Sequence, residues 1–354
     1  LVGRACEITA VRKKLLTGRA ALVGLPGVGK TTLALELASD VLVRTAFPGG
    51  ILWADVGHPP NLDGILRSWC KILLEFSPQK MARLTQEKLL LALQAALSDQ
   101  KVCLILDDVW ASIDARTLLQ IAGPNCGVLI TTRFPMIAAD LVGDDPYTLR
   151  ELDESDGLHL LRLLAHQAVE MEPEKVRELV RAVGGLPLAL TLMGRYLASE
   201  AISGQARRIV RALEHLSDAR ERLDTGERSL RSVISLSENL LAEAERSAFH
   251  ALGLLPPKPG SFSEHAALAV AGCTTEVLDT LVDLGLLEPT GKDYRFHQTI
   301  SDYAQAMLSP TEHLLAEERL LTSILDALAT KAVEPGWLEQ EKQTILLAID
   351  AADH

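Results

Sequence analysis

The chain has 354 residues, of which 48% are hydrophobic and 23% are charged, as in soluble globular domains. Its 35 Lys and Arg residues against 47 Asp and Glu residues give a formal net charge of −12, which disfavours nucleic acid and anionic membranes as partners. No apolar run approaches the ~18 residues of a membrane span. The five cysteines lack the spacing of a zinc site, so we expect free thiols and a cytoplasmic protein.

Short apolar runs alternate with helical patterns over the first 150 residues or so. The runs predict strands at residues 20–23, 51–56, 102–106, 127–131 and 147–149. Between them, apolar spacings of three and four residues predict helices at 31–39, 62–76 and 86–97. Apolar strands separated by helices are typical of a parallel sheet covered on both faces. We therefore expect an α/β domain at residues 1–152.

The pattern becomes helical after Asp153. Helices are predicted at 158–167, 173–183, 186–199 and 205–215, which suggests a helical domain at 153–222 with a polar linker at 217–229. Four more helices, at 230–240, 242–252, 264–271 and 277–284, precede a predicted hairpin around Gly291. This order favours a winged-helix domain at 223–309. Two amphipathic helices are expected from Thr311, as the start of a C-terminal helical region at 310–354. Because the sequence begins without Met and inside a motif, we expect a segment of a longer protein.

The most specific motif is Gly24-Leu-Pro-Gly-Val-Gly-Lys30-Thr31, a complete P-loop between a predicted strand and a predicted helix. Its glycines let backbone N–H groups surround phosphates, and the helix N-terminus adds its positive end. Lys30 is expected to reach the β- and γ-phosphates, and Thr31 to ligate Mg²⁺. The motif therefore predicts binding of a nucleoside triphosphate or diphosphate.

Polar residues follow two of the predicted strands. The strand at 102–106 delivers Asp107 and Asp108 to its C-terminal edge, where α/β sheets bind ligands. Two adjacent acids after a P-loop suggest that Asp107 positions Mg²⁺ and that Asp108 activates water. The next strand ends at Thr131-Thr-Arg133, where Arg133 could sense a γ-phosphate.

With these motifs in order, the chain resembles the NB-ARC group of STAND ATPases, which includes plant disease-resistance proteins and the apoptotic protease-activating factor. The resemblance covers residues 1 to about 308. It rests on Val2-Gly3-Arg4 with Glu7, the P-loop, Leu106-Asp-Asp-Val-Trp110, Thr131-Thr-Arg133, Gly185-Leu-Pro-Leu188 and Phe296-His297.

The resemblance implies a role for each matching residue. Val2, Arg4 and Pro187 would contact the adenine, and His297 would reach the β-phosphate of ADP from the winged helix. The phosphates would lie against Pro26, Gly27, Val28, Gly29, Lys30, Thr31 and Thr32. Thr31 and Asp107 would hold the metal, and the catalytic set would be Asp108, Asp107, Lys30 and Arg133. Gln298 stands where the family usually has Asp after this histidine.

The resemblance also implies a function, a molecular switch that is closed with ADP and open, assembly-competent and self-associating with ATP and Mg²⁺. Slow hydrolysis and further effector and sensor domains in the full-length chain belong to the same expectation. One alternative is an ATPase-coupled, DNA-binding transcriptional regulator acting through the winged helix, although its expected recognition helix at 275–284 has three acids and no arginine. A mechanical AAA+ motor is a second alternative. It needs fast turnover and an arginine from a neighbouring subunit, for which the sequence offers no assignable residue.

Overall fold

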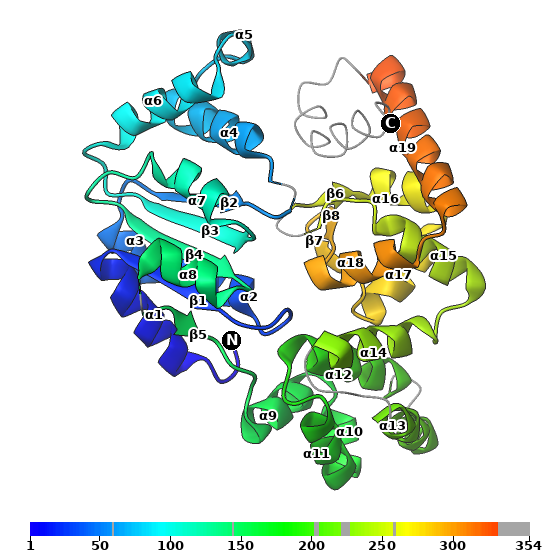
Figure 1. The fold of residues 1–354 in the computed structure, drawn as a ribbon. Coiled ribbons are helices and arrows are strands. Elements are labelled where there is room, and N and C mark those ends of the chain that lie inside the picture. Colours follow the sequence, from blue (N-terminus) through cyan, green and yellow to red (C-terminus); the bar gives the residue numbers. More distant parts are fainter. Residues whose placement is uncertain (59, 144, 202–204, 221–226, 258–259, 332–354) are drawn as a thin grey trace. The chain divides into compact units, whose positions relative to one another are not determined.

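The computed structural model describes the chain except for residues 59, 144, 202–204, 221–226, 258–259 and 332–354 (Figure 1). The chain divides into two compact units, Leu1–Glu151 and Leu152–His354. Each unit buries its own apolar side chains. Among the described residues, no helix is both long enough and apolar enough to cross a bilayer.

A five-stranded sheet forms the centre of the first unit. Its strands lie in the order β2-β3-β4-β1-β5, and all neighbours are parallel. Their bounds are β1 Arg19–Val23, β2 Ile51–Asp55, β3 Cys103–Val109, β4 Gly127–Thr132 and β5 Tyr147–Thr148. Because the strands are parallel, their C-terminal ends meet at one edge of the sheet, and the P-loop follows β1 at that edge.

Helices cover both faces of this sheet (Figure 1). One continuous apolar core joins alternate residues of β1 to β4 with α4, α6, α7 and α8. Apart from the exposed Arg19, the remaining residues of β1 and β4 are also buried, and these strands contact α1 and α2. The helices of this unit are α1 Ala5–Thr17, α2 Lys30–Ser39, α3 Val41–Ala46, α4 Leu62–Leu74, α5 Pro78–Ala82, α6 Gln86–Leu97, α7 Ser112–Leu119 and α8 Pro135–Val142. The predicted parallel sheet with two covered faces is confirmed.

The sequence analysis missed several helices of this unit and ended one of its strands too early. It missed the short helices α3, α5, α7 and α8, and it also missed α1, which has 13 residues but is weakly amphipathic. It also ended β3 at Leu106, whereas the strand continues through both acids to Val109. The pairing of β3 with β4 shifts its register between Leu106 and Val109, so the two acids lie in a β-bulge.

The second unit is mostly helical. Its helices are α9 Glu154–Leu164, α10 His166–Met171, α11 Pro173–Ala182, α12 Pro187–Ala201, α13 Ala206–Arg220, α14 Glu227–Glu238, α15 Glu243–Leu252, α16 Glu264–Ala271, α17 Thr275–Asp283, α18 Gln298–Met307 and α19 Pro310–Lys331. The predicted hairpin is confirmed, since β7 Glu288–Thr290 pairs antiparallel with β8 Asp293–Arg295 across Gly291, whose φ is +66°. A short third strand, β6 Phe262–Ser263, pairs with the other side of β8.

One expectation for this unit changes, and another lies partly outside the described residues. The predicted linker at 217–229 is wrong at both ends, because α13 continues to Arg220 and α14 begins at Glu227. Residues 221–226 of that linker lie outside the described residues. The tail begins with α19, and the second helix expected after it lies outside the described residues.

Candidate functional site

The loop between β1 and α2 has the backbone shape that a P-loop requires. Gly27 and Gly29 have φ values of +77° and +100°, in the left-handed region that favours glycine. Gly29 precedes α2 and has no side chain that could cap the helix. The N–H groups of the first helical turn therefore remain available to bind an anion such as a phosphate. Among the other predicted loop residues, Pro26 and Val28 are buried and Thr32 is exposed.

Lys30 is the first residue of α2, directly after this loop. Its Nζ donates hydrogen bonds to the carbonyl oxygens of Gly24 and Leu25, at 2.9 and 3.0 Å. Burial and, to a smaller extent, repulsion from Arg133 lower its pKa to about 8, although attraction to Asp108 and Asp107 opposes both effects. A phosphate beside the ammonium would stabilise the charged form, because an opposite charge offsets desolvation.

Thr31 and Asp107 form a pair of oxygen ligands suited to magnesium. The Thr31 hydroxyl donates to the Asp107 carboxylate, with oxygen separations of 2.9 and 3.2 Å. An octahedral Mg²⁺ ion with ligands at ~2.0–2.1 Å places neighbouring ligand oxygens ~2.9 Å apart. The described residues contain no cluster of three or more His, Cys, Asp or Glu side chains that could hold a metal by itself. One carboxylate and one hydroxyl therefore fit an ion whose remaining ligands come from phosphates and water.

The carboxylate of Asp107 is buried at the end of β3. Burial raises its pKa to about 6, while the hydroxyls of Thr131 and Thr31 oppose the rise by donating hydrogen bonds. Thr131 also accepts the backbone N–H of Asp108 at 2.9 Å. One threonine on β4 therefore fixes both acids of β3.

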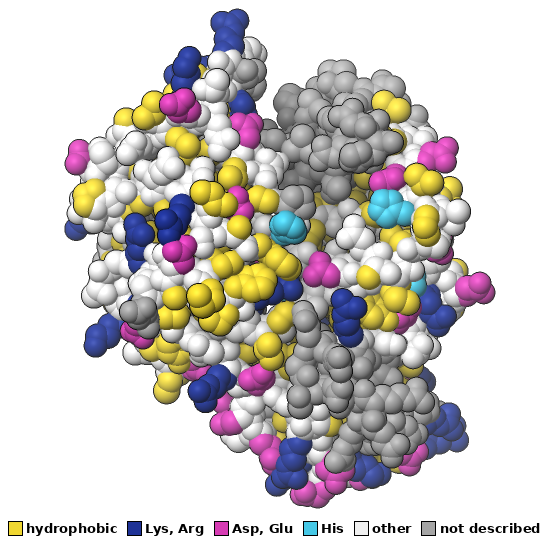
Figure 2. Space-filling view, in the orientation of Figure 1, with side chains coloured by type: hydrophobic (Ala, Val, Ile, Leu, Met, Phe, Trp, Pro, Cys, Tyr) yellow, Lys and Arg dark blue, Asp and Glu magenta, His cyan; other side chains and the backbone are white. Residues whose placement is uncertain are grey.

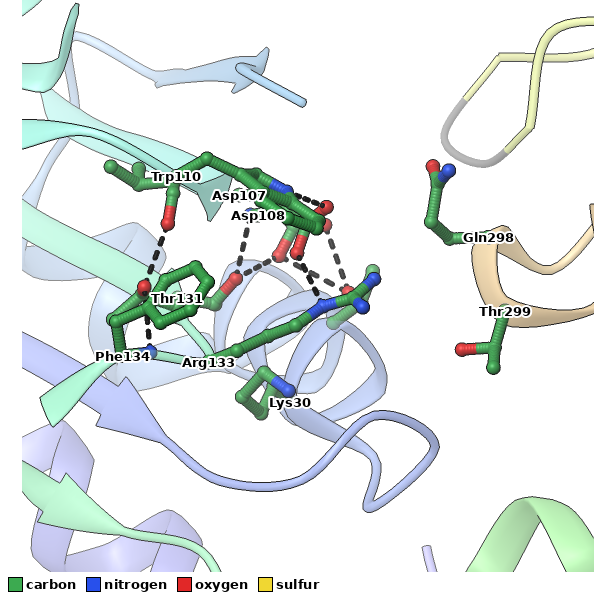
Figure 3. A network of polar contacts seen from close by, with 12 residues as sticks. Lys30, Asp107, Asp108, Trp110, Thr131, Arg133, Phe134, Gln298 and Thr299 are labelled. Atoms are coloured by element: carbon green, nitrogen blue, oxygen red, sulfur yellow. Dashed lines mark hydrogen bonds and ion pairs between the residues drawn. The ribbon is translucent and has the colours of Figure 1, made fainter. Parts of the chain in front are cut away.

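Asp108 has a different environment from Asp107. Its φ is +50°, which is uncommon for a residue other than glycine and turns its side chain within the bulge. The indole N–H of Trp110 donates to Oδ2 at 2.8 Å, and Nε of Arg133 lies 3.5 Å from Oδ1. In Figure 3, Asp107, Asp108, Thr131 and Arg133 gather beside Lys30.

A third carboxylate, Asp55, ends β2 at the same edge. It pairs in register with Asp107, and Val56 donates its N–H to the Asp107 carbonyl oxygen at 3.0 Å. Burial raises the pKa of Asp55 to about 8, and repulsion from Asp107 and Asp108 adds to the rise. Three carboxyl groups thus crowd this edge, where a divalent cation would favour their charged forms.

The N-terminal motif touches the P-loop directly. The Arg4 side chain is 3% exposed and donates to the Glu7 carboxylate at 3.0 Å and to the Val28 carbonyl oxygen at 3.2 Å. Val2 lies just before this arginine and is half-buried. Arg4, one of the two predicted adenine-contacting residues of this unit, is therefore anchored to the phosphate loop.

The remaining predicted residues belong to the second unit. Pro187 is the first residue of α12, and His297 precedes α18. Nδ1 of His297 accepts the Thr299 backbone N–H at 3.2 Å, so a neutral ring carries its proton on Nε2. Gln298 donates to Asp302 at 2.7 Å. The histidine ring is thus oriented by the helix backbone, although Gln298 replaces the usual Asp.

The sequence pattern of the NB-ARC domain family matches residues 6–171. The chain contains an NB-ARC domain. The match includes the P-loop, the acids of β3 and Arg133, and it continues from the first unit into α9 and α10.

Named relatives agree with this assignment. The chain is 30% identical to the regulatory protein AfsR of Streptomyces coelicolor over 82% of its length, covering 29% of that protein. It is 27% identical to AfsR of Streptomyces griseus over 97% of its length, covering 36% of that protein. Human apoptotic protease-activating factor 1 is 29% identical over 54% of the chain and 16% of that protein. The chain thus spans about a third of the AfsR proteins that it matches.

A solved structure supports the fold. A STAND protein with a tetratricopeptide repeat sensor from Pyrococcus horikoshii superposes with a TM-score of 0.64 at 17% identity. The superposition covers 100% of this chain and 48% of that one. The fold is therefore that of a P-loop NTPase with an appended helical part.

Sequence reasoning assigned no role to three side chains of the NB-ARC site, namely Asp55, Trp110 and Thr131. Asp55 is the last residue of an apolar strand, and this position at the carboxyl end of the strand could have identified it as a site residue. Trp110 and Thr131 belonged to recognised motifs, but their hydrogen bonds to the acids depend on the pairing of β3 with β4. The pattern of the sequence does not reveal that pairing.

Proposed function

We propose that the chain is the nucleotide-dependent switch of a signal-transduction ATPase. It binds ADP in a closed resting state and ATP with Mg²⁺ in an open, assembly-competent state, and it hydrolyses ATP slowly. The observation that carries this proposal is the convergence of Lys30, Thr31, Asp107, Asp108 and Arg133 at one sheet edge.

Each side chain has a role suited to phosphate chemistry. Lys30 binds the β- and γ-phosphates, and Thr31 and Asp107 hold the metal. Mg²⁺, when bound, neutralises charge on the phosphates. Asp108 orients the attacking water and accepts its proton, and Arg133 contacts the γ-phosphate.

The second unit supplies the conformational response. We propose that α14 to α17 with the β6-β8-β7 sheet form a winged helix, and that the Nε2 proton of His297 is donated to the β-phosphate of ADP. Pro187 contacts the adenine from the helical part.

ATP shifts the equilibrium between the closed and open states because a γ-phosphate makes contacts that exist in one conformation only. Inverting a 1:99 population takes ~5.5 kcal/mol, which two or three charge-assisted hydrogen bonds supply. The open form then self-associates and engages the effector and sensor domains of a longer cytoplasmic protein.

The direct test is the nucleotide that the protein carries. Denaturing the purified protein and separating the released nucleotides should give ADP or ATP in near-equal ratio to protein. Lys30→Ala should remove it while the folded state persists, because the variant loses the ammonium that binds the phosphates. Lys13→Ala, an exposed lysine on α1, is the matched control and should retain its nucleotide. Full occupancy in Lys30→Ala would refute the nucleotide site.

The alternative, a DNA-binding regulator acting through the winged helix, fits the surface less well. On α17, the expected recognition helix, Glu276, Asp279 and Asp283 are all exposed and spaced along one side. On the face drawn in Figure 2, the coloured Lys and Arg side chains lie in small groups interspersed with Asp and Glu. A protein bound to phosphates would lose affinity steeply as salt increases. A salt-dependent shift of duplex DNA by the native protein would favour this alternative.

A further inference from the structure

Trp110 makes an interaction that the roles proposed above leave unused. We propose that Trp110 is a positioning residue for ATP hydrolysis, whose indole N–H fixes one oxygen of Asp108 so that the other receives the proton of the attacking water. This inference rests on the proposed function, because it requires Asp108 to act on that water.

The first observation is that the backbone turns Asp108 out of the regular strand. Asp108 lies in the β3 bulge with a φ of +50°, and its N–H is held by the Thr131 hydroxyl at 2.9 Å. This backbone places the carboxylate between the ring of Trp110 and the guanidinium of Arg133 (Figure 3).

The two carboxylate oxygens are held unequally. Oδ2 accepts a 2.8 Å hydrogen bond from the indole of Trp110. Oδ1 faces Nε of Arg133 at 3.5 Å, beyond the usual length of a charge-assisted hydrogen bond. The bond to Trp110 is therefore the one that defines the orientation of the carboxylate.

Trp110 itself is held by aromatic neighbours. Phe134 meets its ring edge-on with centroids 5.5 Å apart, and His58 stacks on it, also at 5.5 Å. The Arg133 guanidinium lies over the same ring, 4.8 Å from its centroid. A tryptophan packed in this way has little rotational freedom, whereas an arginine beside it has several rotatable bonds that allow it to reach a phosphate.

These contacts assign different tasks to the two oxygens. An indole N–H can only donate, and the bond that it donates to Oδ2 lowers the basicity of that oxygen, so Oδ1 is the better proton acceptor. A γ-phosphate attracts Arg133 away from Oδ1, and Oδ1 can then accept the proton of the attacking water.

In hydrolysis the water oxygen bonds to the γ-phosphorus, and the bond from this phosphorus to the β–γ bridging oxygen breaks. The electron pair of that bond leaves with ADP, and the water proton passes to Oδ1 and then to solvent.

A purely structural Trp110 would behave differently when its N–H alone is removed. Trp110→Phe keeps an aromatic ring against Phe134 and Arg133 but loses the donor. Trp53→Phe is a matched control from the same sheet, because the buried indole N–H of Trp53 has no partner among the described residues. Benzothienylalanine at position 110 is a second variant, which replaces the N–H by sulfur and keeps the two-ring shape.

The experiment measures single-turnover hydrolysis and ATP affinity of the full chain. Losing a hydrogen bond to a charged group corresponds to a ~10- to 100-fold slower rate, which we expect for Trp110→Phe and for the benzothienyl variant. The ATP affinity of both position-110 variants should equal that of the native chain. Trp53→Phe should match the native chain in hydrolysis rate and in ATP affinity. Adding Trp110→Phe to Asp108→Asn should slow hydrolysis no further, because the indole acts through the carboxylate.

Three outcomes would overturn the assignment. Native hydrolysis rates in both position-110 variants would show that the N–H is unimportant. Equal slowing by Trp110→Phe in the native and Asp108→Asn backgrounds would indicate a packing role. If Asp108→Asn itself hydrolysed ATP at the native rate, the proposed role of Asp108 would fail as well, which separates failure of the function from failure of the positioning.

Discussion

Asp107 and Asp108 are consecutive in the chain, but their carboxylates have different surroundings. Asp107 is 2% exposed and receives hydroxyl hydrogen bonds from Thr31 and Thr131, whereas 18% of the Asp108 side chain is exposed. In a regular strand the two side chains would point to opposite faces of the sheet. The bulge and the positive φ of Asp108 bring both to the same edge. The proposed metal ligand and the proposed proton acceptor can therefore come from adjacent positions.

The residue-scale prediction concerns Asp108→Asn. The variant keeps the size of the side chain but loses the proton acceptor, whose contribution as a general base is typically 10²- to 10⁴-fold. ATP should bind with unchanged affinity, and hydrolysis should be slower by at least ~100-fold. The native rate should itself be low, on the order of 10⁻⁴ to 10⁻³ per second, as in unassisted small GTPases.

Radiolabelled phosphate release under single-turnover conditions measures this effect. Asp99→Asn, at an exposed position after α6, is the matched control and should hydrolyse ATP at the native rate. Weak ATP binding by Asp108→Asn would contradict the separation of binding from chemistry. Native turnover of many ATP molecules per second would favour a mechanical motor.

At the scale of elements, the Gly185-Leu-Pro-Leu188 motif marks the start of α12 and ties it to the beginning of the second unit. Pro187 is the first helical residue, where its fixed φ suits the helix and its missing N–H has no consequence. Gly185 has a φ of +70° and accepts the Leu152 N–H at 3.0 Å. A Cβ at Gly185 would lie 2.0 Å from the Leu152 carbonyl oxygen, so only glycine fits there.

The neighbouring glycine provides a matched comparison for a stability prediction. Gly184 has a φ of +60°, but a Cβ there would meet no atom within 4 Å. Gly184→Ala should therefore cost only the ~1–2 kcal/mol of left-handed backbone strain. Gly185→Ala adds a clash with backbone and should cost more than ~3 kcal/mol. Urea unfolding followed by circular dichroism measures both, and equal losses for the two variants would disprove the clash.

At the scale of the whole molecule, the proposed switch depends on a histidine carried by a firmly held helix. Behind His297, α18 is tied to α14 and α15 through Glu238, which is 5% exposed. His250 lies 2.8 Å from Glu238 Oε1, and the Tyr303 hydroxyl donates to Oε2 at 2.5 Å. Burial, with the hydrogen bond to Glu238, raises the pKa of Tyr303 to about 12, so it stays protonated at neutral pH. The position of His297 is thus fixed within its own unit.

The whole-molecule prediction is that His297→Ala accelerates ADP release. Losing one charge-assisted hydrogen bond to the β-phosphate should cost the closed state ~1.5–3 kcal/mol, which corresponds to ~10- to 100-fold faster exchange. Release of a fluorescent ADP analogue, chased with unlabelled ADP, measures the rate. His265→Ala, an exposed histidine on α16, should release ADP at the native rate.

The opposite result is also informative. If His297→Ala released ADP at the native rate and lowered the melting temperature with or without nucleotide, its ring would be only a helix cap. In that case the contact with the β-phosphate and the role of the winged helix as a nucleotide-dependent latch would both be wrong.

Local order in the sequence determined much of this protein. The P-loop could be read without a structure, because its glycines, lysine and threonine act within eight consecutive residues. The central strands β1, β3 and β4 were also predictable, since strands buried on both faces are apolar almost throughout. The short helices α3, α5 and α7 escaped prediction because so few turns carry little periodic signal.

The tertiary structure alone decided how the site is assembled. The strand order β2-β3-β4-β1-β5 places the ends of β2, β3 and β4 beside the P-loop, although they come from distant parts of the chain. That order brings Asp55 next to Asp107, and the β3–β4 register brings Thr131 to both acids. Trp110 reaches Asp108 only because the bulge turns the carboxylate toward it. Spacing along the chain does not encode strand neighbours or bulges, because both result from how the helices and strands pack together.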